Sequence, residues 1–224
     1  MTSALGISLV LSSFLIAGLP VFASGSSGSG GGAPILSVRV YNNALVARDT
    51  LSFAEEETSR VFLQAGIAIT WIHCGPDEQP HPACNEPLSP SVLIMRLFRG
   101  AKLARRGLYS FCCGFAIRPQ NGLGGTYATI FYDCAQEIAR GTHLPEDVVL
   151  GHLLAHEIGH LMLSSPTHAQ SGIMRDRLNG KDWQLAARGL LLFTEEQIAD
   201  MRAAILARNG QEERLQVAWS PRAK

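Results

Sequence analysis

PEDVVLGHLLAHEIGHLML, residues 145–163, is the most informative stretch of this chain because it combines a helical pattern with closely spaced polar side chains. Pro145 suits a first helical position, and Glu146 and Asp147 place negative charge where the helix dipole favours it. One apolar stripe follows at helical spacing, formed by Leu150, Leu154, Ile158 and Leu161. Pro166 prevents the helix from continuing far beyond Leu163. We therefore predict a long helix with a buried face.

Within this helix lies the sequence His156-Glu157-Ile158-Gly159-His160. Two histidines four residues apart project from the same helical face, so both can reach one cation at the ~2.0–2.1 Å of a zinc–nitrogen bond. Glu157 points to a neighbouring direction, where its carboxylate can activate a water beside the metal without binding the metal itself. The pattern predicts a zinc site with His156 and His160 as ligands and Glu157 as catalytic base.

A catalytic zinc needs a third protein ligand and keeps its fourth position open. His168, eight residues after His160, is our candidate. His152 lies one turn before His156 and could be a ligand or hydrogen-bond a ligand, but we favour an ordinary buried histidine. Glu195 and Glu196 could supply a ligand from a later helix, although helix-start charges explain them equally well.

These residues resemble the metzincins, zinc peptidases with His-Glu-x-x-His, a turn, a third His and a later Met-turn beneath the metal. The resemblance covers about residues 145–175 and implies His168 as third ligand and Met174 as the Met-turn residue. Metzincins usually carry Gly and then His at the positions held here by Leu163 and Pro166. The third His arrives two residues late, a lengthened connection similar to that of the leishmanolysin branch.

The resemblance implies a zinc metalloendopeptidase with one catalytic Zn²⁺ and a peptide or protein as substrate. It also implies a zincin-like single domain, in which a mixed twisted sheet packs on the long active-site helix, followed by the Met-turn and a C-terminal helix. A sheet edge would bind the substrate by strand addition, with residues 126–132 as our candidate. A non-catalytic zinc-binding module and a zinc hydrolase of a non-peptide bond remain the alternatives.

The rest of the chain predicts an α+β fold. A capping box at Ser52 and Glu55 predicts a helix ending at Gly66, and Thr194 with Gln197 predicts a second one through about Arg208. Alternating or β-rich segments predict strands at residues 36–41, 67–72, 92–98, 114–118 and 126–132. We assign residues 33–210 to the catalytic domain and 211–224 to a C-terminal tail.

The N-terminal region predicts export from the cytosol. Residues 5–22 are apolar and uncharged, so we predict a signal peptide over residues 1–23, with an uncleaved membrane anchor as the alternative. Residues 24–32 are almost entirely Gly and Ser, which predicts a flexible tether. The domain is then secreted or periplasmic, or anchored outside the cytosol.

Charge and cysteine content narrow the possible partners. The chain has 19 Lys and Arg residues and 19 Asp and Glu residues, so its formal net charge is zero. It therefore has no overall positive charge that would attract nucleic acid or an anionic membrane. Five cysteines suit an oxidising compartment. Cys74 and Cys84 flank a Pro-containing loop that a disulfide could close, and Cys134 could pair with Cys112 or Cys113. The sequence leaves oligomeric state, cleavage specificity and latency open.

Overall fold

A computed structural model describes residues 33–75, 78–100, 113–117, 125–165 and 168–219, with side chains to residue 215. These residues belong to one compact unit, residues 32–224. The predicted signal peptide and tether, together with Cys112, lie outside the described residues. In chain order the elements are β1 (Ile35–Asn42), α1 (Arg48–Gln64), β2 (Ala68–His73), η1 (Pro82–Cys84), β3 (Val92–Phe98), β4 (Gly114–Ile117), β5 (Tyr127–Phe131), α3 (Tyr132–Thr142), α4 (Glu146–Met162), α5 (Gly180–Ala186) and α6 (Glu195–Trp219).

The described strands form one mixed sheet in the order β2-β1-β3-β5-β4. Three neighbouring pairs are parallel, and β4 alone runs antiparallel, against β5. Our expectation that residues 126–132 form the edge was wrong, because β5 pairs with β3 on one side and with β4 on the other. The edge strand on this side is β4. Residue alternation predicts a strand but says nothing about which strand becomes its neighbour.

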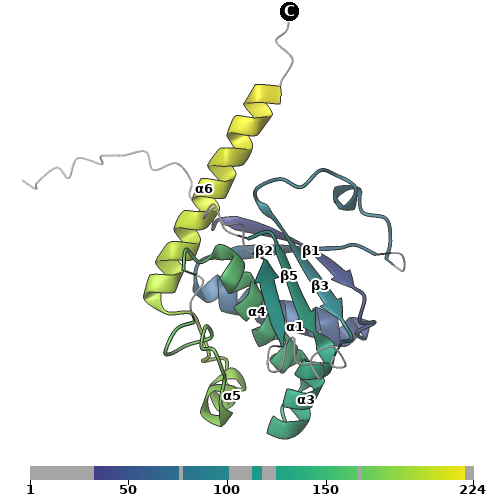
Figure 1. Ribbon diagram of the computed structural model, residues 1–224, viewed down its shortest axis with the longest axis vertical. Coiled ribbons are helices and arrows are strands. Elements are labelled where there is room, and N and C mark those ends of the chain that lie inside the picture. Colours follow the sequence, from purple (N-terminus) through teal and green to yellow (C-terminus); the bar gives the residue numbers. More distant parts are fainter. Residues whose placement is uncertain (1–32, 76–77, 101–112, 118–124, 166–167, 220–224) are drawn as a thin grey trace, which may run out of the picture. The chain divides into compact units, whose positions relative to one another are not determined.

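Helices α1 and α4 lie side by side on one face of the sheet (Figure 1). Their contact is close because Gly151 has no side chain: a Cβ there would lie 2.8 Å from the Ala54 carbonyl oxygen. Thr58 Oγ1 lies 2.8 Å from that oxygen and 2.9 Å from the Gly151 carbonyl oxygen. The stripe predicted on α4 is fully buried here, at Leu150, Leu154, Ile158 and Leu161. This packing holds α4, the helix that carries the candidate site, against α1.

The ends of α1 and α4 test the predicted helix signals. Helix α4 follows Pro145 and stops at Met162, as expected. Helix α1 begins at Arg48, so the predicted capping box at Ser52 was wrong: Ser52 and Glu55 lie inside the helix. Glu55 is instead buried, 3.2 Å from His73 Nε2 at the end of β2. Glu55 therefore contacts a distant strand and does not cap the helix, although the Ser-x-x-Glu pattern is present.

Helix α6 carries the second predicted capping box. The Thr194 backbone N–H donates to Gln197 Oε1 at 2.9 Å, and the Gln197 N–H donates to Thr194 Oγ1 at 3.4 Å. The helix runs to Trp219, further than the predicted end near Arg208. Arg208 itself is buried and donates to the carbonyl oxygens of Pro90, Gly125 and Leu161. It thereby joins α6 to the end of α4 and to the segments that enter β3 and β5.

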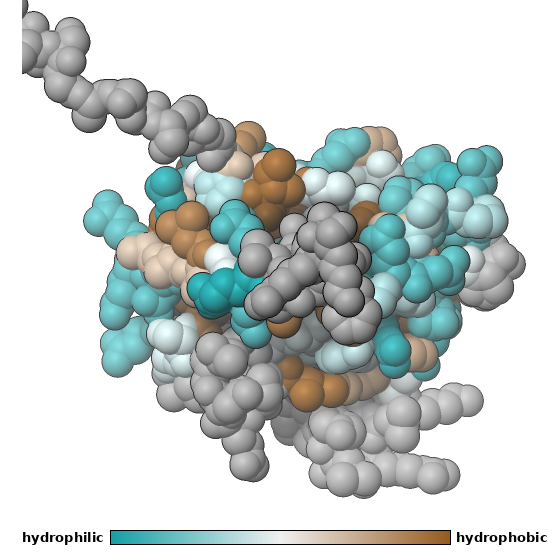
Figure 2. All heavy atoms as spheres, turned by 90° about the horizontal axis from the view of Figure 1, so that it is seen from above, coloured by the Kyte–Doolittle hydropathy of each residue, from teal (hydrophilic) through white to brown (hydrophobic). Residues whose placement is uncertain are grey.

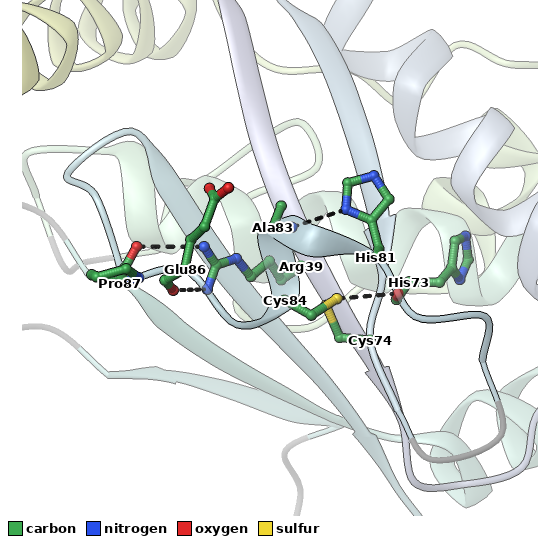
Figure 3. Close-up of a disulfide and its surroundings, with 8 residues drawn as sticks. All are labelled: Arg39, His73, Cys74, His81, Ala83, Cys84, Glu86 and Pro87. Atoms are coloured by element: carbon green, nitrogen blue, oxygen red, sulfur yellow. Dashed lines mark hydrogen bonds between the residues drawn. A yellow bond between two sulfur atoms is a disulfide. The ribbon is translucent and has the colours of Figure 1, made fainter.

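Two disulfides close loops around the sheet. Cys74 pairs with Cys84 as expected, and Cys134 pairs with Cys113, which selects one of the two partners left open by the sequence. Near the first disulfide, buried Arg39 donates to the Glu86 carbonyl oxygen at 2.9 Å and to that of Pro87 at 3.5 Å (Figure 3). The segment that follows Cys84 is therefore fastened to the middle of β1.

Exposed large apolar side chains are scattered over many elements of the described surface. They include Phe53 and Leu63 on α1, Ile117 on β4, and Leu206 and Leu215 on α6. In the view from above, hydrophobic residues are interspersed with hydrophilic ones (Figure 2). Scattered residues of this kind are normal on a globular domain. Among the described helices, none has the length and apolar character needed to cross a membrane.

Candidate metal centre

Helix α4 presents His156 and His160 one turn apart, and the fold fixes the orientation of the first. His156 is 9% exposed, and its Nδ1 lies 2.7 Å from the Ile173 carbonyl oxygen. A carbonyl only accepts hydrogen bonds, so Nδ1 carries the proton and Nε2 presents its lone pair. Burial lowers the pKa of His156, which keeps the ring neutral. A neutral imidazole with a free Nε2 lone pair is the form that binds a metal.

His168 completes a three-histidine cluster. His160 Nε2 lies 3.0 Å from His156 Nε2 and 3.1 Å from His168 Nε2. The ligand nitrogens of all three lie within 4.8 Å of one another. The chain reaches this position because α4 ends at Met162 and the chain then turns back toward the helix. Next to His168, the Ala169 N–H donates to the Met174 carbonyl oxygen at 2.8 Å.

The three nitrogens fit a single zinc ion. Two nitrogens bound tetrahedrally to one zinc at ~2.05 Å are separated by about 3.3 Å, close to the 3.0 and 3.1 Å that separate His160 Nε2 from its two neighbours. A neutral histidine has at most one Nε2 proton, so His160 cannot donate to both neighbours at once. A shared cation satisfies all three lone pairs together. The donor set, three imidazoles on a helix and the turn after it, matches that of catalytic zinc sites.

Glu157 lies beside this cluster in a protected position. It is 6% exposed, and its Oε2 has no hydrogen-bond partner among the described residues. Burial raises the pKa of Glu157 to about 8. A divalent cation held by the neighbouring histidines would oppose this shift, because an opposite charge favours the carboxylate. An unpartnered buried carboxyl group beside a candidate metal centre is typical of a catalytic base.

Strand β4 passes directly over Glu157. A Cβ at Gly114 would lie 2.7 Å from Glu157 Oε1 and 2.6 Å from the Thr129 carbonyl oxygen, so only glycine fits between this carboxylate and strand β5. Strand β4, at the edge of the sheet, is therefore in contact with Glu157, the candidate catalytic base. Sequence reasoning missed Gly114 as a site residue, because a glycine at the start of a short strand carries no signal of a distant glutamate.

Met174 lies in a turn beneath the helix. Its side chain is fully buried, and a Cβ at Gly159 would lie 2.6 Å from Met174 Sδ and 2.9 Å from Phe193 Cε1. Gly159 therefore allows the methionine to pack under the segment that carries His156 and His160. The turn also brings Asp176 Oδ1 to 3.3 Å from His168 Nδ1, a contact that the sequence did not reveal.

The other candidates lie elsewhere. His152 is fully buried, with Nδ1 2.9 Å from the Val148 carbonyl oxygen and Nε2 3.6 Å from Glu57 Oε1, and it is not part of the cluster. Glu195 and Glu196 occupy the first turn of α6, where a helix favours negative charge. Among the described residues, the three-histidine cluster is the only group with metal-binding geometry.

No protein-family profile and no curated protein sequence matches the chain. Among solved structures, archaemetzincin from Methanopyrus kandleri is similar with a TM-score of 0.46 and 12% identity, over 80% of this chain and 99% of that chain. A Thermotoga maritima protein solved in solution is similar with a TM-score of 0.34 and 10% identity, over 84% of this chain and 99% of its own. At this level of similarity neither match assigns the chain a family or an activity.

Proposed function

We propose that this chain is a zinc-dependent metallopeptidase with a metzincin-like, zincin-type site. His156, His160 and His168 would hold one zinc ion, Glu157 would act as the general base, and Met174 would form the base of the site. The proposal rests on one observation: three histidine nitrogens lie within 4.8 Å of one another, beside a buried glutamate whose Oε2 is unpartnered.

Bound zinc polarises a carbonyl group and lowers the pKa of a water toward ~7. Glu157 Oε2 is the atom that we assign to take the proton from the attacking water, and the same carboxyl group then delivers it to the departing amine. The Ile173 carbonyl oxygen keeps the His156 ring in its ligating tautomer throughout. The low exposure of Glu157 limits exchange of that proton with bulk solvent.

We propose that a peptide substrate binds in extended form along β4. Within the described residues this strand has a hydrogen-bonded neighbour, β5, on one side only. Peptides commonly add to such an open edge through backbone hydrogen bonds. Because Gly114 of β4 contacts Glu157, a peptide on this edge would pass close to the base. This replaces residues 126–132, which we had expected to form the edge.

We propose that the enzyme acts outside the cytosol. The disulfides Cys74–Cys84 and Cys113–Cys134 support this, because such bonds persist mainly in oxidising compartments. The apolar stretch at residues 5–22 supports it from the sequence.

Metal analysis and peptide cleavage test the proposal together. The purified chain, Glu157→Gln and His168→Ala would be assayed for bound zinc by mass spectrometry and for turnover on a peptide library and on esters. We expect about one zinc per chain in the first two proteins and weakened binding in His168→Ala, with cleavage only in the first. Zinc without any turnover would indicate the non-catalytic module, and turnover of esters alone would indicate a non-peptide hydrolase. Absence of zinc from the wild-type chain would refute all three functions.

A further inference from the structure

One turn contacts two of the three histidines from behind. Residues 172–176 supply the Ile173 carbonyl oxygen, 2.7 Å from His156 Nδ1, and Asp176 Oδ1, 3.3 Å from His168 Nδ1. Both contacts are made by the nitrogen that faces away from the cluster centre. Groups that contact the outer nitrogen of a ligating histidine set its tautomer and ring orientation. The position of this turn therefore fixes the direction of two candidate ligands.

The turn is held in place from outside by α5 and the segment after it. Arg175, between Ile173 and Asp176, donates through Nη1 to Asp182 Oδ1 at 3.1 Å and to Oδ2 at 3.0 Å. Asp182 is 6% exposed and also accepts the Asn179 N–H at 2.8 Å, within the capping box of α5. The Ile173 N–H donates to the Leu192 carbonyl oxygen at 3.0 Å.

The backbone of the turn gives this ion pair particular importance. Gly172 has φ +74°, a conformation that glycine adopts without strain, so the turn begins at a residue that has no side chain to anchor it. Met174 fixes the inner side by packing against Gly159. On the outer side, Arg175 is the side chain of the turn that reaches the buried carboxylate of Asp182. Without it, Asp182 keeps its negative charge with less compensation, and the turn loses its ion pair with α5.

We propose that the Arg175–Asp182 ion pair is a positioning device for the metal centre. It holds residues 172–176 so that Ile173 and Asp176 orient His156 and His168 toward one cation. The pair touches neither the metal nor a substrate and acts through the turn. The inference rests on the proposed zinc site and adds a determinant of metal affinity that lies outside the ligand set.

Zinc affinity of the full chain provides the test. Arg175→Gln, Asp182→Asn and the double variant would be compared with wild type by competition against a chelator of known affinity. Groups that directly contact ligating histidines typically contribute 10–100-fold to metal affinity, and because this pair acts through such groups we expect each single variant to weaken binding by about tenfold, at the lower end of that range. The double variant should be no weaker than the worse single one, because either substitution already breaks the pair. The absorption spectrum of bound Co²⁺ should change in the same variants.

Two further variants separate positioning from general destabilisation. Arg48→Gln removes the same charge from an exposed arginine, 3.6 Å from Glu78, and should bind zinc as wild type does. Arg175→Lys keeps the charge and stem, so it should fold and lose less affinity than Arg175→Gln. Zinc affinities within twofold of wild type in all Arg175 and Asp182 variants would overturn the inference alone. A wild-type chain that binds no zinc would overturn both the inference and the proposed function.

Discussion

Replacing Gly114 by alanine should impair catalysis while leaving the metal in place. The added Cβ would lie 2.7 Å from Glu157 Oε1, 2.9 Å from Glu157 Cδ and 2.6 Å from the Thr129 carbonyl oxygen. A relaxed carbon–oxygen contact is about 3.3 Å, so the Cβ must separate from both oxygens, by roughly 0.6 Å from Glu157 Oε1 and about 0.7 Å from the Thr129 carbonyl oxygen. Thr129 belongs to the backbone of β5, which is paired on both sides. Because Thr129 is held, β4 must shift to relieve that contact, and the Glu157 side chain is the other partner that must move.

The expected loss follows from that displacement. A misplacement of about 1 Å can cost roughly a hundredfold in rate, so about 0.6 Å should lower kcat/KM by about tenfold or more. The three atoms nearest to this Cβ belong to Thr129 and Glu157 and to none of the histidines, so zinc affinity should stay within about threefold of wild type. Overpacking should also lower the free energy of unfolding by about 1–3 kcal/mol. The assay is steady-state cleavage of the best library peptide, with zinc affinity measured on the same preparation.

Gly141→Ala is the matched control, because a Cβ there meets nothing within 4 Å. It should leave kcat/KM unchanged. If Gly114→Ala cleaves the peptide as fast as wild type, then Glu157 is not the base or does not lie under β4. If zinc affinity falls in parallel with activity, the substitution disrupts the whole site and the separation between base and ligands is wrong.

Three further predictions concern stability. Gly159→Ala would place a Cβ 2.6 Å from Met174 Sδ, so urea unfolding should show a loss of about 1 kcal/mol despite the better helix former, whereas Gly141→Ala should gain about 0.5–1 kcal/mol. Removing the Cys74–Cys84 disulfide by a double serine substitution should cost about 3 kcal/mol by loop entropy, and an unchanged urea midpoint would contradict this. The hydrogen bond to Glu55 raises the pKa of His73 above 6.5, so its stabilisation is complete below that pH and lost as pH rises through the raised pKa. The burial of Glu55 raises its pKa and acts in the same direction. The Tm difference between wild type and His73→Gln should therefore shrink from about pH 6 to pH 8, and a constant difference would argue against the pairing.

Local signals in the sequence were enough to predict most elements. The apolar stripe of α4, the alternation of β1 and the capping box at Thr194 each depend on residues a few positions apart, and each of these three elements begins within one residue of where it was expected. Helix α3 was not predicted, because it follows β5 without a turn or a capping side chain. The order of β5 and β4 was also beyond reach, since the pairing of strands depends on contacts between distant segments.

The residues of the candidate site also fall into two groups, those that the sequence indicated and those that only the structure reveals. The i, i+4 spacing of His156 and His160 indicated a shared face, and His168 lies against that face as the resemblance implied. The Ile173 carbonyl oxygen could not be predicted, because every residue has one and only the turn decides which faces His156. Nothing in the sequence singled out Asp182, because its bond to Arg175 depends on how the turn is folded.

This division suggests that metal binding and catalysis depend on different parts of the chain. All three candidate ligands come from residues 156–168, and the groups that orient two of them come from the turn that follows. Glu157, in contrast, is confined by Gly114 of β4, whose neighbour Cys113 is bonded to Cys134 on α3. A disturbance of β4 should therefore displace the base before it displaces the metal, whereas a disturbance of the Arg175–Asp182 pair should weaken the metal first. Variants of β4 should thus lose activity before metal affinity, and variants of the Arg175–Asp182 pair should lose metal affinity first.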